Sequence, residues 1–199
     1  MPDAVAALAA LQEDIRRCRI CRPLFGFEPN PVVYGHQDAP IMQISQAPSL
    51  RVDRSGYPFN DQSGRKLKHE WYRIEEETFY NPDLFYLTSL AHCYPGKLPK
   101  GGDRPPPKVC ARWLDRELDC VRTGLYIVIG SRAARHLFPD AAFVDLVFHD
   151  QSLRGKPALV LPHPSPLNRY WMRRYPDFET VRVPAVRDRV HAALAPFDV

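Results

Sequence analysis

Four short apolar runs constrain the fold of this chain more than any other feature. They lie at 41–44, 84–90, 125–129 and 158–161, and a turn-forming residue stands at or soon after the end of each. Their length and their β-branched or aromatic content are typical of β-strands. Strands that alternate with helical patterns indicate βαβ units, so we expect an α/β fold with a mostly parallel sheet covered on both faces.

Helical patterns fill the segments between these runs. We expect helices at the N-terminus and at 64–78, 107–121, 131–137 and 180–194, the last interrupted by Pro184. The N-terminal segment has an acid at Asp3 and no basic leader. We therefore interpret it as an amphipathic helix rather than a secretory signal.

Composition narrows the class of protein. With 45% hydrophobic and 25% charged residues the chain can bury a core, and 199 residues fit a single domain spanning 1–199. The apolar runs are too short to cross a bilayer, so we expect no membrane partner. Since the N-terminal segment does not resemble a secretory signal, we expect a cytoplasmic protein. We also expect a monomer, because no feature of the sequence demands a second copy. The 27 basic and 23 acidic residues give a net charge of +4, which permits a polyanionic partner without requiring one.

Ligands of parallel sheets collect outside the carboxyl ends of the strands. The segments that follow the four apolar runs are therefore the places to look for a site. They are SQAPS at 45–49, SLAHCYPG at 89–96, GSRAARHL at 130–137 and LPHPSPLNR at 161–169.

The five cysteines favour a metal site over disulfide bonds. An odd number of cysteines in a chain without a secretory signal argues against a disulfide framework. Cys18 and Cys21 form a C-x2-C pair, and Cys93 and Cys110, separated by sixteen residues, can complete a set of four thiolates. The alternative is that these cysteines are small buried hydrophobic residues. Spacing alone does not separate zinc from an iron–sulfur cluster, and Cys120 has no partner in this pattern.

The segment LPHPSPLNR presents a histidine on a rigid turn. Pro162 and Pro164 restrict the backbone on both sides of His163, and Leu167 is an apolar residue at the tip of the loop. Three arginines follow in a stretch without acids: Arg169, Arg173 and Arg174. These features suit an enzyme that wedges a duplex and acts on an extruded base. A structural turn with a capping histidine on a solvated basic face is an equally good interpretation of this segment alone.

A second segment, residues 41–67, combines a tight turn with an aromatic ring and a carboxylate. Pro58 fixes Phe59, Asp61 follows two residues later, and Gly64 stands at the expected start of a helix. Backbone N–H groups, a stacking ring and a carboxylate can hold a planar base and activate a water molecule. The alternatives are core packing for Phe59 and a turn or cap role for Asp61.

Together these motifs resemble the uracil-DNA glycosylase superfamily, and most closely its bacterial iron–sulfur branch, families 4 and 5. The family's first motif (GEAPG or GLAPG), its G-x-PF segment and its HPS motif correspond to SQAPS at 45–49, GYPF at 56–59 and HPSP at 163–166. The spacing of the four cysteines resembles that of the family's 4Fe-4S ligands. The resemblance covers roughly residues 10–195.

The resemblance implies a three-layer α/β/α sandwich with a central four-stranded parallel sheet, and hydrolysis of the bond between a base and deoxyribose in DNA. It implies that Phe59 stacks on the flipped base and that Gln46 and Ala47 contact the base and position water. It also implies that His163 donates a hydrogen bond to the base O2 as negative charge develops there.

The resemblance further assigns residues to the DNA backbone and to a cofactor. Ser165 and its basic neighbour Arg169 would contact a phosphate, and Leu167 would fill the gap left in the base stack. A 4Fe-4S cluster would be the cofactor, with zinc less favoured. Its ligands would be Cys18, Cys21, Cys93 and Cys110.

The chain departs from the family pattern in its first motif and at its base-reading position. Ala47 stands where the GQDPY motif has its aspartate, so we assign water activation to Asp61, which resembles the aspartate of the family 5 pattern PF-x-GD-x-SG. Ser89 stands where the family has an asparagine that distinguishes uracil from cytosine, so other deaminated bases are candidate substrates. Ser45 and Ser49 replace the flanking glycines of the first motif, where side chains can crowd the substrate.

Three hypotheses follow. The leading one is a base-excision repair glycosylase that acts on uracil or a related deaminated base in DNA. The second is a DNA-binding or damaged-base-binding protein that retains the fold and the cluster but has weak or no catalysis, and Ser45, Ser49 and Ser89 motivate it. The third is an unrelated α/β hydrolase that uses His163 and has no cluster.

Overall fold

A five-stranded sheet lies at the centre of the computed structural model, which describes residues 3–197. The strand order is β2-β1-β3-β5-β4. Four of the strands are mutually parallel: β1 (Ile41–Ser45), β2 (Phe85–Ser89), β3 (Leu125–Ile129) and β5 (Lys156–Leu161). They coincide with the four apolar runs, so the expected α/β class and the four parallel strands are confirmed.

The fifth strand was not expected from the sequence. Strand β4 (Gln151–Leu153) pairs antiparallel with β5 through a two-residue turn. Arg154 and Gly155 form that turn with positive φ angles of 50° and 75°, as the tight hairpin turns compatible with twisted strands require. With only three residues and no apolar alternation, β4 lacked the pattern that identifies a strand.

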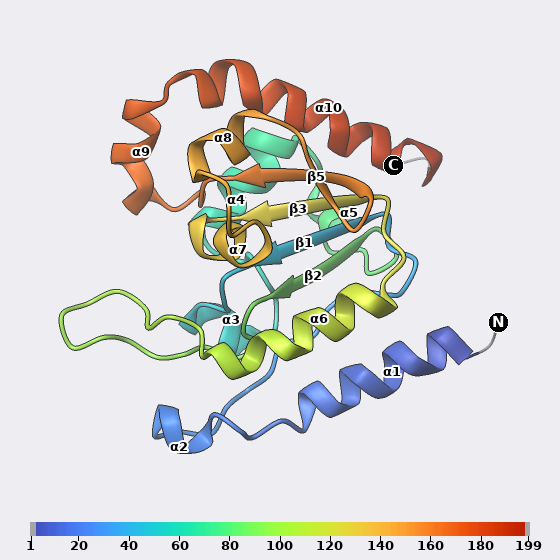
Figure 1. Cartoon of the computed structure of the whole chain (residues 1–199), viewed down its shortest axis with the longest axis vertical. Helices are drawn as coiled ribbons and strands as arrows, with labels where there is room; N and C mark the ends of the chain where they lie inside the picture. The colour runs from blue at the N-terminus through green and yellow to red at the C-terminus, as the bar shows by residue number, and fades with distance from the viewer. Residues whose placement is uncertain (1–2, 198–199) are drawn as a thin grey trace.

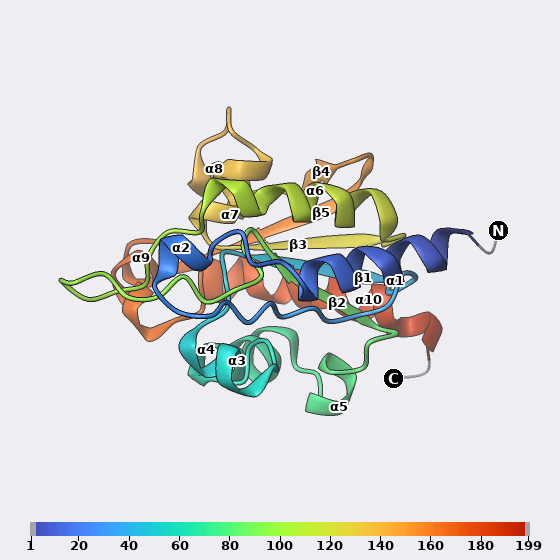
Figure 2. The ribbon, with the colours of Figure 1, turned by 90° about the horizontal axis from the view of Figure 1, so that it is seen from below.

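Helices cover both faces of the sheet, as Figure 2 shows most clearly. One face carries α6 (Ala111–Cys120), α7 (Ser131–Leu137) and α8 (Phe143–Phe148), and α1 (Asp3–Arg16) packs against α6. The other face carries α3 (Leu50–Ser55), α4 (Gln62–Arg65) and α5 (Glu76–Phe79). On that face α10 (Val183–Leu194) packs against a π-helix, Lys66–Tyr72. The arrangement agrees with the expected three-layer α/β/α sandwich.

The helices at 107–121 and 131–137 are confirmed, and two other expectations need correction. The expected helix at 64–78 is interrupted, because Arg73 adopts a left-handed conformation (φ 55°) that ends the π-helix before α5 begins. Pro184 does not interrupt the helical course of this segment, because a π-helix (Phe178–Arg182) runs directly into α10 and Pro184 lies at the start of α10. The short helices α2 (Arg22–Phe25), α3, α8 and α9 (Arg169–Arg174) were not anticipated. Within residues 3–197, no helix has the length and apolar character needed to cross a membrane.

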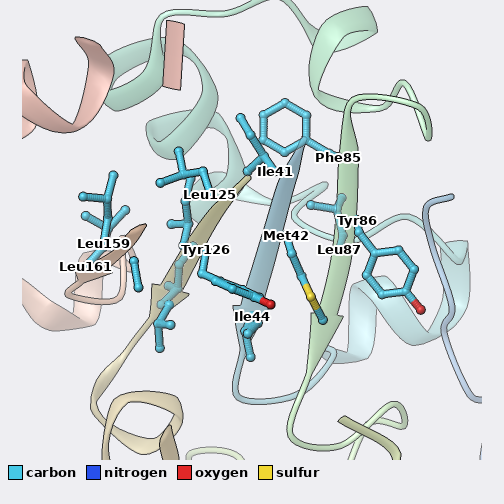
Figure 3. Close-up of a cluster of buried hydrophobic side chains, with 14 of the residues drawn as sticks. Ile41, Met42, Ile44, Phe85, Tyr86, Leu87, Leu125, Tyr126, Leu159 and Leu161 are labelled. Carbon is cyan, nitrogen blue, oxygen red and sulfur yellow. The ribbon is translucent and has the colours of Figure 1, made fainter. Parts of the chain in front are cut away.

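The core lies between the sheet and the helices. Figure 3 shows how Ile41, Met42, Phe85, Leu125 and Leu159 contribute side chains from neighbouring strands. Every residue of β2 and β3 is buried. Strands covered on both faces consist largely of apolar residues without alternation, which is why they stand out in the sequence as short apolar runs.

All four parallel strands point toward the same edge of the sheet, on the left in Figure 1. There α7, α9 and the long loop between β2 and α6 gather around the strand ends. Strand β1 is flanked by β2 on one side and β3 on the other, so the chain reverses its direction across the sheet at this point. Such a switch point is where open α/β sheets bind ligands.

Candidate active site

A cavity of about 500 Å³ opens at the carboxyl edge of the sheet. Segments that follow β1, β2, β3 and β5 all contribute to its wall, as does the turn before α4. The predicted site residues that line it are Gln46, Ala47, Phe59, Asp61, Ser89, His163, Ser165 and Leu167. Of the predicted catalytic and substrate-binding residues, Arg169 is the one outside this lining, on the adjacent helix α9.

His163 is held by hydrogen bonds within its own loop. The Ser165 backbone N–H donates to His163 Nδ1 at 3.1 Å, and the Asn168 side-chain amide donates to the His163 carbonyl at 3.0 Å. Because Nδ1 accepts a hydrogen bond, the proton of the neutral imidazole is assigned to Nε2. His163 is exposed toward the cavity, yet the protein around the ring removes part of its hydration and lowers the pKa of His163, while Asp61 and Asp103 oppose that shift. The ring is therefore a neutral, oriented donor at Nε2.

Phe59 lies on a strained turn at the cavity wall. Its φ angle is 56°, and the Tyr80 hydroxyl donates to the neighbouring Pro58 carbonyl at 2.9 Å. The Phe59 ring meets the Phe79 ring edge to face, with 6.3 Å between centroids. Gly64 permits this turn, because a Cβ there would lie 1.6 Å from the Phe59 carbonyl oxygen. The ring thus packs against the core and also lines the cavity.

Asp61 has a structural role as well as a place in the cavity. Its Oδ1 accepts a hydrogen bond from the Gly64 backbone N–H at 3.1 Å, which makes Asp61 the N-cap of α4. A carboxylate has several acceptor positions, so the cap leaves capacity for a ligand or water. Asp61 therefore caps α4, as the alternative interpretation predicted, and this cap is compatible with the expected contact to water.

The two serines that flank the first motif both use their hydroxyls in hydrogen bonds to the backbone. The Ser49 hydroxyl accepts from the Val52 N–H at 3.3 Å and caps α3. The Ser45 hydroxyl donates to the Thr88 carbonyl at 3.4 Å. Both residues line the cavity together with Gln46, and their hydroxyls are oriented by strand β2 and by the start of α3, respectively.

Ser89 is buried at the base of the cavity, where its hydroxyl donates to the Ala91 carbonyl at 2.7 Å. With its proton used in that bond, the hydroxyl offers a ligand only acceptor positions. An acceptor at this point suits a base that presents an N–H group.

The loop after His163 carries the exposed apolar tip and the basic residues. Leu167 is 89% exposed, and the Ser165 hydroxyl accepts from its backbone N–H at 3.2 Å. Arg169, Arg173 and Arg174 are exposed on α9.

The structure adds cavity residues that were missed in the sequence. Asp103 comes from the long loop after β2, where the Tyr94 hydroxyl donates to it at 3.3 Å. Arg132 lies in the first turn of α7, and Asn168 follows the histidine turn. Arg132 and Asn168 lie in segments marked by their position after a strand. The loop that carries Asp103 had only a proline- and glycine-rich composition, which indicated a loop and no role.

The four cysteines of the expected metal set converge on a second, small cavity of about 10 Å³. Cys18 and Cys21 follow α1, Cys93 follows β2, and Cys110 immediately precedes α6. All four have free thiols, and the sulfurs of Cys21 and Cys110 lie 3.4 Å apart. Cys120 lies outside this group.

The chemistry of this donor set fits a thiolate-bound metal group. Burial, and then the neighbouring Cys21, raise the pKa of Cys93 to about 12 and also raise the pKa of Cys110. Clustered thiolates repel one another, and binding to a cation removes that penalty. The remaining lining consists of His92 and apolar side chains, Ile15, Pro29, Pro31 and Trp113. Across residues 3–197, however, no three His, Cys, Asp or Glu side chains are already placed around a single ion position.

Comparison with known proteins identifies the family. The family described as the Uracil DNA glycosylase superfamily matches residues 32–187, which is most of the chain. The chain belongs to this superfamily. The matched range of this chain includes its SQAPS, GYPF and HPSP segments. Cys93 and Cys110 also lie within that range, whereas Cys18 and Cys21 precede it.

Three curated relatives carry the name Type-4 uracil-DNA glycosylase. The chain is 26% identical to that of Sulfurisphaera tokodaii over 135 residues, which cover 66% of the chain and 58% of the relative. It is 28% identical to that of Saccharolobus solfataricus over 134 residues, 66% of the chain and 59% of the relative. It is 26% identical to that of Archaeoglobus fulgidus over 125 residues, 62% of the chain and 58% of the relative. The matches therefore span less than two thirds of the length of these superfamily relatives.

Proposed function

We propose that this chain is a DNA repair glycosylase that hydrolyses the N-glycosidic bond of uracil or a related deaminated base. The observation that carries the proposal is the oriented Nε2–H donor of His163 in a cavity that also holds an aromatic ring and a carboxylate. The names of the curated relatives support the same activity.

In the proposed reaction, a water oxygen forms a bond to C1′ of the deoxyribose as the bond from C1′ to the base nitrogen breaks. The electron pair of the broken bond passes to the base, and part of its charge appears on O2. His163 Nε2–H donates to that oxygen and stabilises the leaving base. Asp61 accepts a proton from the water through acceptor capacity not used by the cap of α4.

The remaining site residues bind the extruded nucleotide. Phe59 stacks on the base, Gln46 and Ala47 contact its edge, and Ser89 accepts a hydrogen bond from a base N–H. Leu167 lines the cavity but is 89% exposed, and it fills the vacated space in the duplex. The Ser165 hydroxyl can donate to a phosphate oxygen, and Arg169 supplies a positive charge beside it.

Four cysteines would hold the cofactor, for which we propose a 4Fe-4S cluster, with zinc less favoured. They are Cys18, Cys21, Cys93 and Cys110. When bound, the cluster would cross-link the segment after α1 to the end of β2 and the start of α6. We further propose that residues 1–199 form one domain that acts on DNA as a cytoplasmic monomer without a membrane partner.

An oligonucleotide panel tests the activity. Single- and double-stranded substrates containing uracil, hypoxanthine, xanthine or hydroxymethyluracil are incubated with protein, and cleavage at the resulting abasic site is measured. We expect release of at least one of these bases, and loss of that release in His163→Ala. Tight DNA binding without release of any of the four would instead support the second candidate, a binding protein. Ser89 favours that candidate, because one hydroxyl stands where the family has an asparagine and makes fewer directional hydrogen bonds than an amide.

A further inference from the structure

Glu117 is a buried carboxylate that contacts residues of both cavities. Its partner Thr88 lines the cavity of about 500 Å³ (the base cavity), and its partner His92 lines the small cavity with the four cysteines (the cysteine site). Glu117 of α6 is 1% exposed and accepts hydrogen bonds from the Tyr86 hydroxyl at 2.8 Å and the Thr88 hydroxyl at 2.6 Å. His92 Nε2 lies 3.1 Å from both Glu117 carboxylate oxygens. A buried carboxylate is costly unless its oxygens are well hydrogen-bonded, and these three partners meet that need.

His92, in contrast, is only half satisfied. Its side chain is 3% exposed, and Nε2 contacts Glu117 and Thr88. Its second nitrogen, Nδ1, is buried and has no hydrogen-bond partner among residues 3–197. Leaving such a nitrogen unpaired is destabilising, and native proteins seldom do so without a reason.

The surroundings of His92 indicate what the missing partner is. His92 immediately precedes Cys93 and lines the same small cavity as all four cysteines. Because Nδ1 is bonded to Cγ, it lies on the side of the ring nearer the main chain that continues into Cys93. Sulfur is the only acceptor type that the other side chains of this cavity offer.

We propose that His92, oriented by Glu117, donates a hydrogen bond from Nδ1 to a sulfur of the cluster held by the four cysteines, and thereby raises its reduction potential and retards its loss. The inference rests on the proposed cluster. The Glu117 oxygens contact Nε2, so Nδ1 is the ring nitrogen left to face a cluster sulfur. Hydrogen bonds to the sulfurs are among the factors that set the potential of iron–sulfur clusters. His92 is thus a positioning residue and not a catalytic one.

Two substitutions of His92 separate this role from simple packing. An asparagine side-chain amide can place its N–H group near the position of Nδ1, whereas a glutamine amide reaches the position of Nε2. We therefore compare His92→Asn with His92→Gln, and use Glu117→Gln to disturb the orientation of an intact His92. Tyr86→Phe is the matched control, because it removes a hydrogen bond to Glu117 without touching His92.

The full-length proteins are purified without oxygen and their iron content is measured. The midpoint potential of the cluster is then determined by voltammetry, and the loss of iron to a chelator is followed by visible absorption. In His92→Gln we expect a more negative potential and roughly tenfold faster iron loss. We expect a smaller shift in the same direction in Glu117→Gln and values near wild type in His92→Asn and Tyr86→Phe.

Two results would overturn the inference, and they are distinguishable. Wild-type potential and iron retention in both His92→Gln and Glu117→Gln would reject the role of His92 while leaving the cluster in place. A wild-type protein that holds no iron when purified without oxygen would remove the proposed cluster itself. The base-release assay is independent of both results.

Discussion

The base cavity and the cysteine site are built in opposite ways, although Ser89 of one and Cys93 of the other are close in the chain. The base cavity has a volume of about 500 Å³ and contains charged, polar and aromatic side chains. The cysteine cavity has a volume of about 10 Å³, and its wall combines four thiols with mainly apolar side chains. One is a large cavity lined by loops, and the other is a small junction between three segments of the chain.

The difference lies in what fixes each site. In the base cavity, hydrogen bonds within the loops orient His163 and the residues around it, so the geometry exists without a ligand. At the cysteine site the thiols meet without a bond between them, and a bound group would supply the cross-link. Substitutions in the cavity should therefore change turnover, and substitutions at the cysteine site should change stability.

The largest effect is expected for His163→Ala. Removal of the donor at Nε2 should lower single-turnover base release by roughly 10³-fold, because it removes stabilisation of charge on the leaving base. DNA affinity and the thermal midpoint should stay close to those of wild type. Equal losses of DNA affinity and of base release, measured on the same uracil-containing duplex, would contradict the role of His163 in the chemical step alone.

Cys21→Ser tests the other side of the comparison. We expect loss of iron and a decrease of about 2–4 kcal/mol in unfolding free energy, or roughly 5–15 °C in thermal midpoint, because a cross-link between distant segments is lost. Cys120→Ser, outside the cysteine cavity, is the matched control and should change neither quantity. An unchanged thermal midpoint and iron content in Cys21→Ser would show that the site is not a metal-stabilised junction.

Two substitutions of Asp61 separate its cap from its proposed chemistry. Asp61→Asn keeps an N-cap acceptor for Gly64, whereas Asp61→Ala loses it at a cost of about 1 kcal/mol of unfolding free energy. Both should lower base release by roughly 10²-fold if the carboxylate activates water. Asp103→Asn is the matched carboxylate control. A larger loss of release in Asp103→Asn than in Asp61→Asn would move the activating role to the loop after β2.

Leu167→Ala should have a smaller effect that depends on the substrate. The side chain is 89% exposed, so its removal should leave stability unchanged. We expect roughly tenfold slower release from duplex DNA and little change on single strands, because only a duplex has a gap to fill. An equal decrease in the rate of base release on duplex and single-stranded DNA would exclude the wedge role of Leu167.

The smallest effect concerns pH. The pKa of His163 is lowered in the folded protein, mainly because the surroundings disfavour the charged ring. A lowered pKa means that the unfolded chain binds the proton more readily, so stability from this group is present above the usual histidine pKa of about 6.5 and declines as pH falls below it. The thermal midpoint of wild type should therefore fall more steeply than that of His163→Asn between about pH 7 and 5. If the thermal midpoints of wild type and His163→Asn fell equally with pH, the protein would not disfavour the charged form of the His163 ring.

Local patterns were sufficient to predict the strands and much of the site. The four parallel strands are buried on both faces, so each is a continuous apolar run that stands out in the sequence. The turns around Phe59 and His163 were identified because proline restricts the backbone at known positions. The order of these segments after the strands then predicted that they would meet at one edge of the sheet, and in the structure they do.

What the sequence could not provide depends on contacts between distant residues. The break at Arg73, the pairing of β4 and the entry of Asp103 into the cavity each depend on packing that no local pattern encodes. The same holds for the buried contacts among Thr88, His92 and Glu117. By itself, the sequence determined the strand pattern, the motifs and the family resemblance, because these are properties of short segments. Only the tertiary structure decided which nitrogen of His163 donates, which serine protons are already used and which buried nitrogen lacks a partner, because hydrogen bonds are set by positions in space.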